Sequence, residues 1–177
     1  MLFSIELCFD DETAEGVRRC WQNLANTAES DYMEVHGIYP HVALSVFDAD
    51  NDSLAEAVFE ECRGRIDPFR LDPCGIGSFS EETAVVFIGF AASPSLLSAH
   101  EATARALSKM GIDAHSYYRR ENWRPHCTLA MNFPRSHLAK AQAMASTFDL
   151  NLPYRISDLA LVSFPPTRLL RQEKIGG

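Results

Sequence analysis

The sequence predicts an α+β fold in which two lobes repeat one plan. Two histidines, His41 and His126, occupy matching settings in the two halves of the 177-residue chain: each follows a proline and opens an apolar, β-rich segment. The periodicity of apolar residues indicates the order strand, helix, histidine strand, helix, strand in each half. We therefore expect one domain of two pseudo-symmetric lobes, at about residues 1–80 and 81–177, with C-terminal strands that could cross back.

The elements of the first half follow from local signals. Residues 2–9 alternate as in a strand, and the acidic residues 10–12 cap a helix with an apolar stripe. The strand of His41 comes next, then a helix that follows residues 50–53 and ends at Gly64. A strand is expected at about 66–73, and the glycine-containing residues 74–79 are expected to form a turn-rich connection.

The second half repeats these signals. Residues 83–90 form a strongly apolar strand. Ser93 and Pro94 then mark a helix start, because serine caps a helix and proline suits its first position, and Gly111 ends this helix. The strand of His126 follows, then a helix from near Pro134 and final strands at about 154–163 and 168–175.

Composition restricts the classes of partner. The net charge of −8 disfavours sequence-independent binding to long duplex nucleic acid, which depends on neutralising phosphates. No apolar stretch is long enough to cross a membrane, and the first residues, with Glu6 inside the apolar run, are expected to form a strand rather than a signal peptide. The five scattered cysteines indicate reduced thiols. We expect a cytoplasmic monomer that does not bind membranes.

The two histidine strands carry the candidate chemistry. Side chains alternate along a strand, so His41 should share a face with Ala43 and Ser45, and His126 with Thr128. Two such strands brought together would place two imidazoles in one pocket, where one can accept a proton and the other donate it. Cys127 should point to the opposite face from its neighbour, which excludes a Cys–His nucleophile pair.

Other residues allow two interpretations. The late basic residues could hold a small phosphorylated ligand or could be a solvated surface run; they are Arg119, Arg120, Arg124, Arg168 and Arg171. Aromatic residues, among them Trp123 and Tyr118, could stack on a nucleotide base or pack in the core or at its rim. There is no phosphate-binding Gly-rich loop of the ATPase type, and the spacing of His and Cys is not that of a zinc site. We therefore expect neither a cofactor nor a metal.

The flanks of the histidines carry a family resemblance. Residues 123–130, Trp-Arg-Pro-His-Cys-Thr-Leu-Ala, and residues 40–44, Pro-His-Val-Ala-Leu, resemble the paired His-x-(Thr/Ser)-hydrophobic tetrads of the 2H phosphoesterase superfamily. This superfamily includes the bacterial 2′-5′ RNA ligase-like proteins and cyclic nucleotide phosphodiesterases. Residues 75–79 and 159–164 resemble its inter-lobe link and its late strand. The resemblance implies antiparallel sheets that line a central cleft, with helices outside.

The resemblance also implies an activity. It points to metal-independent hydrolysis of a cyclic phosphate, of the 2′,3′ type, on a small nucleotide or an RNA end. His41 and His126 would be catalytic, and the substrate-binding candidates are Thr128, Ser45, Arg124, Trp123 and Arg168.

The first tetrad departs from the pattern at Ala43, which lacks the usual hydroxyl. Ser45 lies about 6.6 Å further along the strand, where it could contact a sugar or base. Alternatives are a 2′-5′ phosphodiesterase or RNA ligase using the same site. A non-catalytic module that binds phosphate or nucleotide is a further alternative, and Ala43 favours it.

Overall fold

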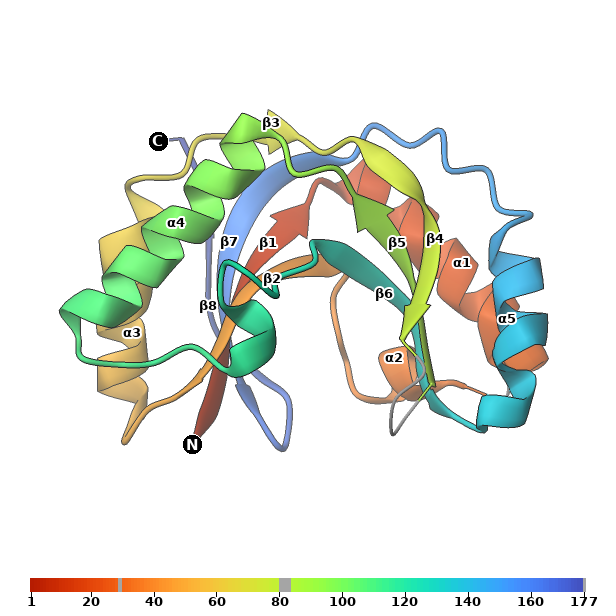
Figure 1. Ribbon diagram of the computed structural model, residues 1–177, viewed down its shortest axis with the longest axis horizontal. Coiled ribbons are helices and arrows are strands. Elements are labelled where there is room, and N and C mark those ends of the chain that lie inside the picture. Colours follow the sequence, from red (N-terminus) through yellow and green to blue (C-terminus); the bar gives the residue numbers. More distant parts are fainter. Residues whose placement is uncertain (29, 80–83, 177) are drawn as a thin grey trace.

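The computed structural model describes residues 1–28, 30–79 and 84–176. It contains two curved sheets with helices on their outer sides (Figure 1). Every pairing between the described strands is antiparallel. The predicted α+β class with antiparallel sheets and outer helices is thereby confirmed.

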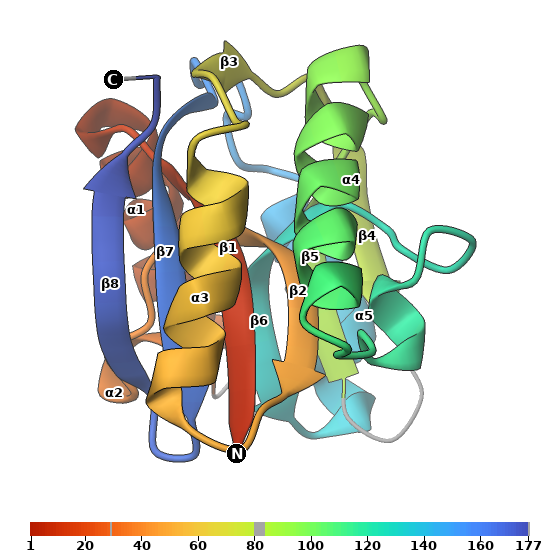
Figure 2. The same ribbon diagram turned by 90° about the vertical axis from the view of Figure 1, so that its left-hand side faces the viewer.

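The first sheet is centred on the N-terminal strand. Its order is β2 (His41–Asp48), β1 (Leu2–Phe9), β7 (Arg155–Phe164) and β3 (Phe69–Arg70), and β8 (Arg168–Lys174) also pairs with β7. Helices α3 (Asp52–Arg63) and α4 (Pro94–Lys109) pack together and cover the outer face of this sheet (Figure 2).

The second sheet has the order β4 (Pro73–Phe79), β5 (Ala84–Phe90) and β6 (His126–Phe133). On its outer side lie α1 (Asp11–Ala28) and α5 (Leu138–Ala145), while the short α2 (Tyr32–Val35) contacts β6.

The two halves of the chain exchange elements between the sheets. Helix α1 comes from the first half yet packs on β6 and α5, and α4 comes from the second half yet packs on β2 and α3. Strands β7 and β8 return to the first sheet. A cut near residue 80 therefore does not separate the two sheets with their helices, and each sheet is completed by both halves of the chain.

The predicted helix starts are confirmed by their caps. Each cap is a side-chain oxygen that accepts a hydrogen bond from a backbone N–H three residues later: Asp10 from Thr13 at 3.0 Å, Asn51 from Leu54 at 2.9 Å, and Ser93 from Leu96 at 3.3 Å. The helix expected from near Pro134 begins as a 3-10 turn at Arg135–His137 before α5. These signals are local, and the sequence therefore reports them well.

The prediction of a turn-rich connection at residues 74–79 is wrong, because this segment is the edge strand β4. Gly77 lies opposite Phe87, and a Cβ at Gly77 would stand 2.5 Å from that ring. The glycine thus makes room for an aromatic ring across the strand pair. The strand expected at 66–73 shortens to β3, and the one expected from Thr83 begins at Ala84, Thr83 lying outside the described residues.

One hydrophobic core joins the two sheets. Phe9 of β1, Phe90 of β5 and Tyr154 contact one another, with ring centroids 5.3 to 6.2 Å apart. All three side chains are buried, so the sheets are fastened together by shared aromatic packing. None of the described helices combines the length and the apolar character needed to span a membrane.

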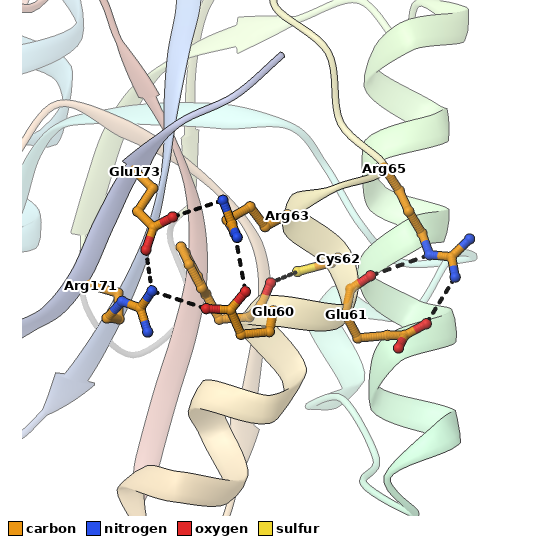
Figure 3. Close-up of polar contacts among 8 residues, drawn as sticks. Glu60, Glu61, Cys62, Arg63, Arg65, Arg171 and Glu173 are labelled. Carbon is orange, nitrogen blue, oxygen red and sulfur yellow. Dashed lines mark hydrogen bonds and ion pairs between the residues drawn. The ribbon is translucent and has the colours of Figure 1, made fainter. Parts of the chain in front are cut away.

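A network of ion pairs fastens α3 to the edge strand β8 (Figure 3). Arg63 lies 2.9 Å from Glu173, Arg171 lies 2.9 Å from Glu60, and Arg171 also contacts Glu173. Exposed pairs of this kind each contribute about 0–1 kcal/mol. Arg171 is therefore committed to two carboxylates on the outer side of the molecule, which supports the surface interpretation for this member of the basic cluster.

Candidate active site

His41 and His126 are the first residues of β2 and β6, and both are half-buried. In each ring Nδ1 lies against the backbone carbonyl two residues earlier: Tyr39 at 2.6 Å from His41, and Arg124 at 2.7 Å from His126. A carbonyl oxygen can only accept a hydrogen bond, so Nδ1 carries the proton in both rings. Nε2 is left in each histidine as the atom that can take or give a proton.

Both histidine strands bulge at the fourth residue of their tetrads. Leu44 is skipped in the register of β1 with β2, and Leu129 is skipped in the register of β5 with β6. The flanking pairs are Ile5–Ser45 and Glu6–Ala43 in the first sheet, and Val86–Ala130 and Phe87–Thr128 in the second. Bulges re-aim side chains, and their shared position marks the two strands as structural equivalents.

Two tryptophans hold the third residue of each tetrad. The indole N–H of Trp123 donates to the carbonyl of Ala43, and that of Trp21 donates to the carbonyl of Thr128, both at 3.0 Å. Trp123 also stacks on His100, with ring centroids 4.1 Å apart. The Trp123 indole therefore has two protein partners, which accounts for its position without a nucleotide base.

The beginnings of the two histidine strands lie close together. Strands β2 and β6 are in contact, and the backbone of His41 lies next to the Cys127 thiol. Figures 1 and 2 both place the start of β2 beside the start of β6. The structure thus brings the two predicted imidazoles into one neighbourhood.

The His41 ring has a carboxylate beside it. Glu6 Oε2 lies 3.6 Å from His41 Nδ1, and Ser4 donates its hydroxyl proton to Glu6 Oε1. Glu6 is only 8% exposed. The two side chains form an ion pair when the His41 ring is protonated.

The His126 ring has aromatic neighbours instead. The rings of Phe79 and Phe87 lie 5.2 and 5.0 Å from it, centroid to centroid. Burial lowers the pKa of His126; the Arg124 carbonyl opposes this shift, and positive charge on His41 adds to it. The neutral form of His126 is therefore favoured near neutral pH.

The predicted phosphate contact Thr128 lies two residues after His126 on β6 and is half-buried. The expectation that Ser45 shares the face of His41 is wrong. The bulge pairs Ser45 with the core residue Ile5, and cross-strand partners point to the same face. Ser45 is 2% exposed, and its hydroxyl has no hydrogen-bond partner among the described residues. The burial removes it from the candidate ligand contacts.

The two predicted arginines lie in different places. Arg124 adjoins the site through its carbonyl, and its side chain is exposed. Arg168 lies 3.7 Å from Asp52 at the start of α3. By strand register, Arg168 is level with Phe3 of β1, and His41 is level with Cys8. Phe3 and Cys8 are five residues apart, which is about 17 Å along a strand. Arg168 is therefore too distant to share one phosphate with His41.

Sequence reasoning missed Glu6 and Trp21 as site residues, whereas Tyr118 is one of the predicted candidates for stacking on a base. Burial, and then the charge of Glu6, raise the pKa of the Tyr118 phenol to about 12, which puts this ring near Glu6. A charged residue within an apolar strand was the available signal for Glu6. For Trp21 no local signal exists, because its hydrogen-bond partner, the Thr128 carbonyl, is distant in sequence.

Two surface hollows lie away from the paired histidines. The hollows, of about 720 and 450 Å³, are lined by residues of 48–54 and 100–121 and include neither active-site histidine. Within residues 1–28, 30–79 and 84–176, no three His, Cys, Asp or Glu side chains form a group suited to a metal ion. The paired histidines thus remain the strongest candidate for chemistry.

Known structures share this fold. Escherichia coli LigT in complex with 3′-AMP aligns with a TM-score of 0.65 and 15% identity, over 99% of this chain and 98% of that one. TT0787 of Thermus thermophilus gives 0.66 and 14%, over 100% and 99%. Kluyveromyces marxianus Usb1 gives 0.53 and 12%, over 98% of each chain. No curated protein sequence matches this chain significantly.

A family model adds evidence at the level of sequence. The model described as the 2′-5′ RNA ligase superfamily matches residues 9–166. This range contains both tetrads and the two tryptophans that bind them, Trp21 and Trp123. Two histidines with matching Nδ1 contacts, on strands with matching bulges, agree with that match. The chain therefore belongs to the 2′-5′ RNA ligase superfamily, whose members are 2H phosphoesterases.

Proposed function

We propose that this protein is a metal-independent phosphodiesterase that opens a 2′,3′-type cyclic phosphate on a small nucleotide or an RNA end. The observation that carries the proposal is the matched pair His41 and His126. Each ring has Nδ1 held by a carbonyl, and each keeps Nε2 for proton transfer. General acid–base catalysis by positioned imidazoles typically contributes about 10²–10⁴-fold to a rate.

The reaction needs one imidazole in each protonation state. The neutral ring removes a proton from water as its oxygen bonds to phosphorus. The charged ring gives its proton to the ribose oxygen as the other P–O bond breaks, leaving a phosphomonoester. Attack and departure are roughly in line, so the two rings should flank the phosphorus from opposite sides. Thr128 would donate a hydrogen bond to a non-bridging oxygen and stabilise its charge.

Known ligands of structural relatives support a small nucleotide as substrate. LigT has been crystallised with 3′-AMP, ATP and NADP⁺, and Usb1 with uridine monophosphate. The exposed Arg124 side chain, which adjoins His126, is the cation we assign to the phosphate.

Ala43 favours a second candidate, a module that binds a nucleotide or phosphate without turnover. It stands opposite Glu6 in the slot that Thr128 fills opposite Phe87, so one lobe lacks a hydroxyl donor. A 2′-5′ phosphodiesterase or RNA ligase would use the same histidines.

One assay separates these functions. The protein is incubated with 2′,3′-cyclic nucleotides, a 2′-5′-linked oligonucleotide and a cyclic-phosphate RNA end, each with and without EDTA. We expect turnover of the cyclic phosphates that EDTA does not change, and a loss of at least about 10²-fold in His41→Ala and His126→Ala. His36→Ala is the matched control, since His36 is an exposed histidine directly after α2. Binding without turnover would support the module, and EDTA-sensitive turnover would contradict the metal-free proposal.

A further inference from the structure

The two lobes place different residues in one equivalent slot. In the first sheet Cys8 pairs with His41 and Glu6 pairs with Ala43. In the second sheet Gly89 pairs with His126 and Phe87 pairs with Thr128. Glu6 and Phe87 therefore occupy the same position relative to their histidines. One slot holds a carboxylate and the other an aromatic ring.

The carboxylate is held where it acts on His41. Ser4 donates a hydrogen bond to Glu6 Oε1, while Oε2 lies 3.6 Å from His41 Nδ1. The Nδ1 proton already points to the Tyr39 carbonyl at 2.6 Å. Glu6 is thus placed as a nearby carboxylate rather than as the hydrogen-bond acceptor of the Nδ1 proton.

The other titratable groups around Glu6 leave it as the acting charge. Burial raises the pKa of the Cys8 thiol, and the pKa of the Tyr118 phenol is raised to about 12, so both stay neutral near pH 7. Asp158 of β7, across from Cys8, has its charge offset by Lys174 Nζ at 3.0 Å. Among the described residues, Glu6 is the carboxylate found within 4 Å of His41.

We propose that Glu6 is a positioning residue that keeps His41 in its proton-donating form, so that His41 is the acid and His126 the base. The assignment of acid and base rests on the proposed function, but the effect of Glu6 on His41 does not. The hydrophobic slot of Phe87 leaves His126 without a matching carboxylate, and its ring stays neutral between two phenylalanines.

The central test replaces Glu6 by glutamine, which keeps the shape and the acceptor for Ser4 but removes the charge. The titration of each imidazole is followed by NMR of its ring protons. We expect the His41 midpoint to fall by about one pH unit in Glu6→Gln. The alkaline limb of the kcat/KM profile should move with it, giving a roughly tenfold loss above that limb. Glu6→Asp should restore most of the shift, and Glu101→Gln, an exposed carboxylate on α4, should change neither readout.

A reciprocal measurement tests the same pair of side chains without any Glu6 variant, and so remains informative if those variants do not fold. In His41→Ala the carboxylate loses its positive partner, so the Glu6 titration, followed by carbon NMR, should rise relative to the wild type. An unchanged His41 midpoint in folded Glu6→Gln, or an unchanged Glu6 titration in His41→Ala, would overturn the proposal. Both titrations are readable in a protein that turns over no cyclic phosphate, so failure of the proposed function gives a separate result.

Discussion

Trp123 donates its indole N–H to the carbonyl of Ala43 at 3.0 Å, across 80 residues of sequence. Trp21 makes the equivalent bond to Thr128 at the same length across 107 residues. Each indole comes from the half of the chain that does not contain the strand it holds. The geometry of either histidine therefore depends on a residue from the opposite half.

Trp123→Phe should weaken both the fold and the reaction. Phenylalanine keeps an aromatic ring against His100 but leaves the Ala43 carbonyl without its donor. An unsatisfied half-buried carbonyl costs about 1–3 kcal/mol in the free energy of unfolding, measured by urea denaturation. We expect kcat to fall more than KM rises, because the histidine strand is less well held. Trp21→Phe should act alike through Thr128, and full stability in both variants would show that the indole bonds contribute little.

Thr128→Val should lower turnover about 10²-fold, the typical loss when one preorganised donor to a developing anion is removed. Valine keeps the shape, and the Trp21 bond to the Thr128 carbonyl is unaffected, so the unfolding midpoint should change little. Ala43→Thr should keep or modestly raise activity by adding a donor in the equivalent slot. Loss of all turnover in folded Ala43→Thr would instead indicate that the small residue makes room for the substrate.

Ser45→Ala should leave activity unchanged and stability equal or higher. Its hydroxyl is buried beside Ile5 with no hydrogen-bond partner among the described residues. Burying such a group costs about 1–3 kcal/mol of desolvation, so its removal should raise the free energy of unfolding by part of that amount. Steady-state kinetics and urea unfolding on one preparation test both statements. A large loss of kcat/KM with normal stability would place Ser45 in the substrate site after all.

The fold should become less stable as the pH falls below about 6.5. Burial lowers the pKa of both His100 and His126 in the folded protein. The unfolded chain then binds protons first, so stability is complete above the usual histidine pKa of about 6.5 and is lost as pH falls toward the folded values. Each group contributes at most about 1.4 kcal/mol per pH unit in that range.

The dependence of stability on pH is measured by urea unfolding at several pH values from about pH 8 to about pH 5, a range that spans the usual histidine pKa. His100→Gln should flatten it, because glutamine can still donate to the Tyr118 carbonyl, which His100 Nε2 contacts at 2.9 Å, but does not titrate. Its stability at the alkaline end should fall, since the stacking on Trp123 is lost. A slope unaltered by this substitution would assign the acid sensitivity to other groups.

Local signals made the histidine strands and the helix starts predictable. Asp10, Asn51 and Ser93 each cap the helix that they precede, and a cap needs no knowledge of tertiary partners. The histidine tetrads were equally visible, since proline, histidine and the following apolar run are contiguous. Such a contiguous pattern predicts both the strand and the histidine that could be catalytic.

Features that depend on strand register were not predictable in this way. Gly77 favours a turn by itself, and the Phe87 ring opposite explains the strand. The bulge at Leu44 turns Ser45 toward the core, whereas simple alternation puts it beside His41. The amphipathic stripe of α1 likewise does not indicate which of two sheets it covers. The place of Glu6 beside His41 likewise depends on its register with Ala43.

The placement of β1 has a consequence for synthesis on the ribosome. Of the described strands, β1 is translated before the others, yet it lies between β2 and β7, and β7 is translated only after β2 to β6. Until β7 emerges, one long edge of β1 lacks its hydrogen-bonded neighbour, and exposed edges invite pairing with other chains. The nascent chain should therefore stay vulnerable to aggregation at this edge until β7 has been translated, and His41, on the strand that pairs with the other edge of β1, should gain its final surroundings only then.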